Sequence, residues 1–257
     1  MKRRLLQFAA LFLLASNCHA AIAYVSSVAA ATYLNSAPGT IALTMTFVAG
    51  NWIGVCGADG KYGTTTITVA DTNLNTWNAS VTAYNLTQGP DLTCFYAQNI
   101  SAGVGDVITV TFVTASGPVA AYAIQFSGIV TTSSIDTTAT ATPNGGSATI
   151  TSGTYSTAQA AEVAVAFARS DTAGTTDTYS AGTGFTLPAA CTDANPNGNQ
   201  GACEYQIYSS TQSGVTAALS TSAASRHWAM AVMVVKGGGA AAVTCSQPKM
   251  MMGVGCK

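Results

Sequence analysis

Alternation between apolar and hydroxyl-bearing side chains along residues 106–129 constrains the fold more than any other feature of the chain. One alternating run covers 108–112 and a second covers 122–126, with the turn signal Ala-Ser-Gly-Pro at 115–118 between them. A period of two residues is typical of a β-strand with one buried face. The stretch therefore predicts a β-hairpin at the centre of a sheet sandwich, with its apolar face against a second sheet.

Similar runs recur along the rest of the chain and predict further strands. They lie at 21–31, 41–48, 51–55, 65–69, 93–97, 147–152, 160–168, 178–187, 202–208, 215–220 and 226–236. The run at 160–168 is rich in alanine, which favours helix, but its valines and phenylalanine alternate, so we expect a strand. A Thr/Ser-rich stretch after Ile129 fits either a boundary between two smaller sandwiches or, as we expect, a loop within one domain.

Composition supports an all-β fold. Charged residues make up only 7% of the chain, against about 25% in an average globular domain. Abundant Thr, Val and Ala suit sheets whose outer faces carry hydroxyls, and recurring Tyr, Phe, Val and Ile argue against disorder. We expect a single two-sheet β-sandwich of jelly-roll type over residues 21–237.

The N-terminus has the pattern of a secretory signal peptide. Three basic residues at 2–4 precede an apolar segment at 5–14, and Cys18-His19-Ala20 ends in small residues suited to signal peptidase. The alternative is a lipoprotein signal with Cys18 acylated. Cleavage after Ala20 would leave six Lys and Arg residues against ten Asp and Glu, a net charge of −4. We expect a secreted, periplasmic or cell-surface protein with no membrane span in its mature chain and no attraction to nucleic acid.

Cysteine usage agrees with export. Six cysteines remain after Cys18, and an even number in an exported chain suggests disulfides. Pairing by sequence neighbour is the simplest arrangement; it joins Cys56 to Cys94, Cys191 to Cys203, and Cys245 to Cys256. The last pair would close a short cystine-bearing tail at 238–257, which follows a Gly-rich linker. A zinc site is not expected, because the sequence lacks C-x-x-C spacing and histidines.

Several longer segments carry a resemblance to a known group of proteins. They are VADTNLNTWNA, CFYAQNISAGVGDVITVTF, AAYAIQFSGIVTTSSID, SGTYSTAQAAEVAVAFA, YSAGTGFTL, EYQIYSS and HWAMAVMVVK. Together, over about residues 69–236, they resemble a family of secreted bacterial β-sandwich domains found alone or as modules of large extracellular proteins. The resemblance implies a fold and no chemistry, so no catalytic residue is carried over. The six mature cysteines and the tail depart from the family pattern.

A calcium-loop spacing occurs between residues 193 and 204. Asp193, Asn195 and Asn197 place oxygens at positions 1, 3 and 5, Gly198 stands at position 6, and Glu204 stands at position 12. The competing interpretation is a disulfide-closed Asn/Gly loop, which we prefer because a proline stiffens position 4 and no helices flank the loop. Structural calcium is the one cofactor hypothesis that the sequence raises.

Aromatic residues in or near loops raise a second hypothesis, a platform for sugars. They are Trp52, Tyr62, Trp77, Tyr84 and Tyr179. Aromatic rings stack on the apolar faces of sugars, while Asn and Asp bind hydroxyls. Trp and Tyr are also ordinary core and rim residues of sandwiches.

No catalytic residues are expected. His227 is the single histidine after residue 20, and the chain has no G-x-S-x-G element for a serine hydrolase. We expect a non-catalytic secreted or cell-surface interaction module, for adhesion or extracellular assembly, whose partner is a glycan, a protein surface or another copy of the chain. The alternatives are a carbohydrate-binding protein and a hydrolase whose carboxylates converge in space.

Overall fold

The computed structural model describes residues 21–60, 65–85, 89–115, 117–142, 146–171, 177–193, 200–222 and 226–238. They form fifteen strands and one 3₁₀ turn: β1 (Ala23–Leu34), β2 (Gly39–Phe47), β3 (Trp52–Asp59), β4 (Ile67–Asp71), β5 (Asn78–Tyr84), β6 (Asp91–Gln98), β7 (Gly103–Phe112), β8 (Gly117–Ser127), β9 (Ile135–Ala141), β10 (Thr149–Thr151), β11 (Glu162–Ser170), β12 (Tyr179–Ser180), η1 (Ala189–Cys191), β13 (Gln200–Tyr208), β14 (Ala218–Thr221) and β15 (Trp228–Lys236). The described chain is all-β, as predicted. No helix in this part of the chain has the length and apolar character that crossing a bilayer requires.

The strands form four antiparallel sheets instead of the two expected from the sequence. Sheet A has the order β1-β8-β3-β6-β5, and sheet B has the order β2-β7-β4. Sheet C has the order β13-β11-β15-β9, and sheet D has the order β10-β14-β12. The expected single two-sheet sandwich is therefore corrected to a four-sheet stack, because alternation marks strands but does not say how many sheets they make.

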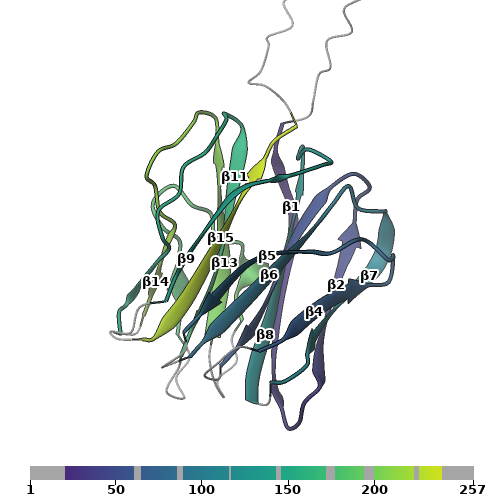
Figure 1. The fold of residues 1–257 in the computed structure, drawn as a ribbon, viewed down its shortest axis with the longest axis vertical. Coiled ribbons are helices and arrows are strands. Elements are labelled where there is room, and N and C mark those ends of the chain that lie inside the picture. The colour runs from purple at the N-terminus through teal and green to yellow at the C-terminus, as the bar shows by residue number, and fades with distance from the viewer. Residues whose placement is uncertain are drawn as a thin grey trace, which may run out of the picture.

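Three apolar cores join the four sheets in the order B, A, C, D. Leu43 and Phe112 lie in the core between B and A, and Phe167 lies in the core between A and C. Leu219 and Val232 lie in the core between C and D. Figure 1 shows β2, β4 and β7 at one side of the stack and β14 at the other. Sheets A and C are thus covered on both faces.

The predicted central hairpin is wrong, although both of its strands exist. β7 pairs with β2 and β4 in sheet B, whereas β8 pairs with β1 and β3 in sheet A. The chain crosses from one sheet to the next between them. β8 lies at the centre of the molecule, since Ala121 and Ala123 face sheet B while Tyr122 and Ile124 face sheet C.

The strand order of the first half of the chain is repeated in the second half. Within sheet A, β1-β8-β3-β6 corresponds to β9-β15-β11-β13 of sheet C, and β2-β7-β4 of sheet B corresponds to β10-β14-β12 of sheet D. β5 has no counterpart, because η1 occupies that connection. We call residues 23–127 repeat 1 and residues 135–236 repeat 2. They meet at the Thr/Ser-rich stretch after Ile129, where the sequence had left a boundary open.

Backbone hydrogen bonds confirm the equivalence of the repeats. Gly60 N donates to Pro118 O at 3.0 Å, and in the corresponding place Asp171 N donates to His227 O at 2.9 Å. When the strand ends of the two repeats are aligned, Asp59 is equivalent to Ser170, Asp91 to Gln200 and Cys94 to Cys203.

A second pair of bonds shows the same equivalence. Val113 N donates to Thr66 O at 2.9 Å, and Ser222 N donates to Thr178 O at 3.0 Å. The repeats therefore share register as well as topology, and each position in one can be compared with its counterpart in the other.

Two of the predicted disulfides are confirmed. Cys56 is bonded to Cys94, joining β3 to β6, and Cys191 is bonded to Cys203, joining η1 to β13. Cys245 and Cys256 lie outside the described residues, as do the expected signal peptide at 1–20 and most of the tail. The domain limits of 21 and 237 stay predictions.

Candidate functional site

The aromatic residues expected to bind sugars do not form one platform. Trp52 is fully buried in the core between sheets A and C, and Tyr179 is 9% exposed with its hydroxyl bonded to Ser170 Oγ at 2.6 Å. Neither ring face is open to a sugar. Both residues lie in segments predicted as strands, and their side chains point into the apolar cores.

The other members of that group are scattered. Trp77 is half-buried against the core between A and B, and its Nε1 donates to Asp71 Oδ2 at 2.6 Å. Tyr84 is half-buried at the end of β5 on the edge of sheet A. Tyr62 lies outside the described residues.

The two acids of the predicted calcium loop lie on opposite faces of sheet C. Asp193 Oδ2 accepts hydrogen bonds from Tyr122 and from Arg169 Nη1, the latter at 3.0 Å, and both partners lie between sheets A and C. Glu204 follows Cys203, whose side chain points into that core, so Glu204 faces sheet D and accepts from Gly182 N at 2.9 Å. The two carboxylates therefore cannot share one ion.

Asn195 and Asn197, the other expected ligands, lie outside the described residues. Within the described ranges, no three His, Cys, Asp or Glu side chains gather in a way that suits a metal ion. Asp193 instead belongs to a buried ion pair with Arg169, whose side chain is 0% exposed.

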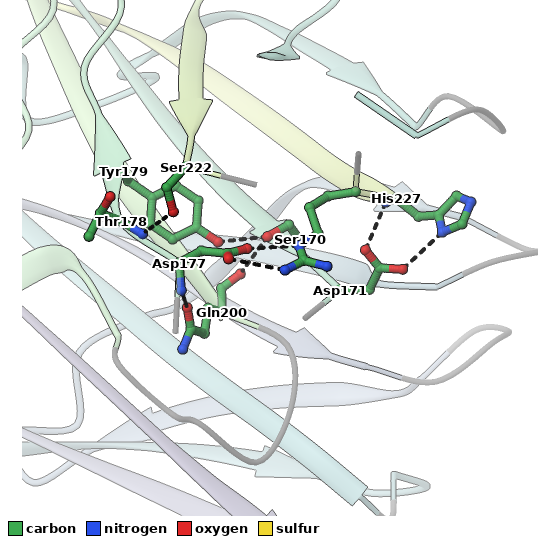
Figure 2. Close-up of polar contacts among 9 residues, drawn as sticks. Ser170, Asp171, Asp177, Thr178, Tyr179, Gln200, Ser222 and His227 are labelled. Carbon is green, nitrogen blue, oxygen red and sulfur yellow. Dashed lines mark hydrogen bonds and ion pairs between the residues drawn. The ribbon is translucent and has the colours of Figure 1, made fainter. Parts of the chain in front are cut away.

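A polar cluster lies where β11 ends and β15 begins. We call Asp171, Asp177, Arg226 and His227 the loop-end cluster. Figure 2 labels Asp171, Asp177 and His227. Its position follows from strand pairing, because Ser170 on β11 lies opposite Trp228 on β15. The residues just outside these paired ends are brought together although 56 positions separate Asp171 from His227.

Asp171 holds His227 by two bonds. Its Oδ1 accepts the backbone N–H of His227 at 2.8 Å, and its Oδ2 lies 2.8 Å from Nδ1 of the ring. The two side chains are 37% and 32% exposed. Figure 2 shows the second ring nitrogen turned outward, away from Ser170. The arrangement presents one imidazole nitrogen and one carboxylate to an incoming group.

Arg226 forms an ion pair with Asp177. Nε lies 2.8 Å from Oδ2, and Nη2 lies 3.1 Å from Oδ1, which is the two-point geometry preferred by guanidinium and carboxylate. The bonded carboxylate raises the pKa of Arg226 above its ordinary value. Side-chain exposure is 12% for Arg226 and 3% for Asp177, so this pair is more deeply buried than Asp171 and His227.

Neutral hydrogen bonds fix the surroundings of the cluster. Gln200 Oε1 accepts the backbone N–H of Asp177 at 2.7 Å, and Ser222 Oγ accepts that of Thr178 at 3.0 Å (Figure 2). These bonds tie the start of β12 to β13 and to the end of β14. The loop-end cluster is therefore placed by strands on several sides.

A shallow groove is a second surface feature. It has a volume of about 360 Å³ and lies between the edge strands β5 and β9. Its lining consists of Ala79, Ser80, Tyr96, Ile135, Asp136, Thr137 and Thr138. The groove thus combines one aromatic ring, one carboxylate and several hydroxyls.

Sequence reasoning singled out His227 but missed Asp171, Asp177 and Arg226. The sequence did contain one signal for this site. Only 7% of the residues are charged, yet Arg226 and His227 stand side by side directly before an apolar strand. Which acids face that pair could not be read without the pairing of β11 with β15.

No family model, no curated protein and no solved structure matches the chain.

Proposed function

We propose that the chain is a non-catalytic secreted or cell-surface interaction module that binds its partner through the loop-end cluster. The observation that carries the proposal is the gathering of the Arg226–Asp177 ion pair and the hydrogen-bonded Asp171–His227 pair at one strand end of a molecule with few charges. Exposed, preorganised polar groups of this kind give binding specificity, since their positions are set before the partner arrives.

Comparison of the repeats supports this choice of surface. The counterparts of Asp171, Arg226 and His227 in repeat 1 are Gly60, Gly117 and Pro118. The same backbone hydrogen bond is made in both repeats, so the fold does not require charged side chains at these positions. Charged side chains at positions where the fold does not need them are candidates for a functional role.

The surroundings of His227 favour binding over hydrolysis. The hydroxyl of Ser170 is bonded to Tyr179, and among the described residues no hydroxyl is hydrogen-bonded to the His227 ring. A serine hydrolase needs that bond between nucleophile and base. The exposed imidazole and carboxylate suit hydrogen bonds to a polar partner, such as a glycan or a protein surface.

Export is part of the proposal. Cys56 and Cys94, and likewise Cys191 and Cys203, form disulfides, and such bonds persist in oxidising compartments. This supports a signal peptide over residues 1–20 and a role outside the cytoplasm, in adhesion or extracellular assembly.

The test is a binding screen of the exported chain against glycans and extracellular proteins, repeated with Asp171→Ala/His227→Ala. Loss of binding in this double variant, with binding kept in Thr68→Ala on the exposed face of β4, supports the proposal. Undiminished binding by the double variant would show that the partner sits elsewhere.

A carbohydrate-binding function is the second candidate, and the groove between β5 and β9 favours it. The ring of Tyr96 would stack on a sugar while Asp136 and Thr137 bind its hydroxyls. Tyr96→Ala in the same screen separates the two candidates, because it alters the groove and leaves the loop-end cluster intact.

A further inference from the structure

Two carboxylates lie directly opposite each other where β3 ends and β6 begins. Asp59 and Asp91 are partners in the antiparallel register, and they are 1% and 2% exposed. Each lies three residues from the disulfide pair Cys56–Cys94, whose sulfurs belong to the core between sheets A and C. Because side chains alternate between faces, both carboxylates point to the other side, toward sheet B.

One oxygen of this pair has no hydrogen-bond partner. Asp91 Oδ1 accepts the backbone N–H of Asn85 at 2.6 Å, and Asp59 Oδ2 accepts the hydroxyl of Thr65. Asp91 Oδ2 is buried without any partner, and so is Oγ1 of Thr93, two residues further along the same face. A buried carboxylate oxygen left without a partner is costly, so these neighbouring atoms indicate a missing positive or polar group.

Repeat 2 shows that the fold does not need carboxylates at this place. Ser170 and Gln200 stand at the positions of Asp59 and Asp91. Ser170 Oγ is bonded to Tyr179, and Gln200 Oε1 accepts from Asp177 N at 2.7 Å. In repeat 2, neutral side chains therefore occupy the two positions that hold carboxylates in repeat 1.

We propose that repeat 1 binds a divalent cation between sheets A and B, held by the carboxylates of Asp59 and Asp91 with the hydroxyl oxygens of Thr65 and Thr93. All four ligands offer hard oxygen atoms, which suit Ca²⁺ and Mg²⁺. Ca²⁺ fits better, because it accepts irregular geometry and completes its shell with backbone oxygens and water.

The electrostatics of Asp91 agree with this site. Burial, together with the negative charge of Asp59, raises the pKa of Asp91 to about 7. A divalent ion would supply positive charge beside the unpartnered Asp91 Oδ2, and its binding would release any proton held on Asp91. The site is separate from the loop-end cluster and does not depend on the proposed function.

The test measures thermal unfolding of the exported chain after EDTA treatment, as CaCl₂ or MgCl₂ is added up to 10 mM. We expect the melting temperature to rise by several degrees with calcium and less with magnesium, and calorimetric titration to give one ion per chain. Asp59→Ser/Asp91→Gln copies repeat 2 and should abolish both the shift and the heat. Asp91→Asn, which keeps the shape of the side chain, should do the same if the double variant does not fold.

Asp171→Asn/His227→Gln is the matched control, because it removes a carboxylate of repeat 2 and should keep the full calcium response. Absence of any shift and heat with the unmodified chain at 10 mM calcium overturns the proposal. So does a calcium response that survives in Asp59→Ser/Asp91→Gln or in Asp91→Asn, since the ion would then be bound elsewhere.

Discussion

Cys94 and Cys203 occupy the same position in the two repeats, yet their disulfides reach different elements. Cys94 is bonded to Cys56 on the neighbouring strand β3, whereas Cys203 is bonded to Cys191 in η1. The counterpart of Cys56 in repeat 2 is Phe167, so Cys203 has no cysteine opposite it on the neighbouring strand β11. The Cys56–Cys94 disulfide therefore links two paired strands of sheet A. The Cys191–Cys203 disulfide links β13 to the connection that takes the place of β5 in repeat 2.

Removal of the two disulfides should have unequal effects. Cys56–Cys94 closes 38 residues and Cys191–Cys203 closes 12. Because a longer closed loop restricts the unfolded chain more, we expect Cys56→Ala/Cys94→Ala to lower the free energy of unfolding by about 4 kcal/mol and Cys191→Ala/Cys203→Ala by about 3 kcal/mol. Urea unfolding of both double variants measures this difference. A larger loss from the shorter loop would contradict it and would point to a greater structural role for η1.

A reciprocal exchange between the repeats should reveal backbone strain. Gly50 and Ala161 stand at equivalent positions, two residues before Trp52 and Val163, and both have left-handed backbones with φ of 81° and 59°. Only glycine adopts this region without cost. We expect Ala161→Gly to raise the free energy of unfolding by about 0.5–1 kcal/mol and Gly50→Ala to lower it by about 1 kcal/mol. Equal signs for the two variants in urea unfolding would refute the equivalence.

The sequence predicted most strands because their apolar side chains alternate, but it missed β5 and β9. Both are edge strands with few buried side chains; in β9, only Ala139 is buried. An edge strand gains most of its stabilisation from backbone hydrogen bonds, which leave little trace in the sequence. The disulfide partners of Cys56 and Cys191 were predicted correctly, since each is bonded to the next cysteine along the chain.

Pairing between strands was harder to predict than the strands themselves. The alternation in β7 and β8 is the same whether they form a hairpin or lie in different sheets. The internal repeat could be recognised only from the order and register of the paired strands. Few equivalent positions of the two repeats carry the same residue, apart from Cys94 and Cys203. For the same reason the spacing of Asp193 and Glu204 suggested a calcium loop, although the sheet separates their carboxylates.

Removal of one partner from the buried Arg169–Asp193 ion pair, which lies where repeat 2 packs on repeat 1, should destabilise the protein strongly. Arg169 and Asp193 are buried between sheets A and C, and Tyr122 of sheet A bonds to both. Asp193→Asn leaves the Arg169 charge uncompensated, so we expect a loss of about 3–5 kcal/mol in the free energy of unfolding. Asp171→Asn makes the same chemical change in the more exposed Asp171–His227 pair and should cost less than about 1 kcal/mol. Similar losses for both variants in urea unfolding would exclude a special role for the buried pair.

Glu204 should make the protein less stable as pH rises toward neutrality. Burial raises the pKa of this carboxyl from 4.5 to about 7, despite hydrogen bonds from the backbone N–H groups of Gly182 and Ala218. A group whose pKa is higher in the folded chain binds more protons when folded, so the free energy of unfolding falls between about pH 4.5 and 7. Burial also raises the pKa of Glu162 to about 7, which adds to the same trend.

Glu204→Gln removes the charge that burial disfavours and keeps the acceptor for Gly182. We expect it to raise the free energy of unfolding at pH 8 by about 1–3 kcal/mol, with the gain shrinking toward pH 5, where the carboxyl is already protonated in the folded chain. Urea unfolding at pH 5, 6, 7 and 8 measures both curves, and Asp171→Asn serves as the exposed control. Parallel curves for Glu204→Gln and the unmodified chain would show that Glu204 does not titrate in this range, and the pH dependence would then have to come from other carboxyls.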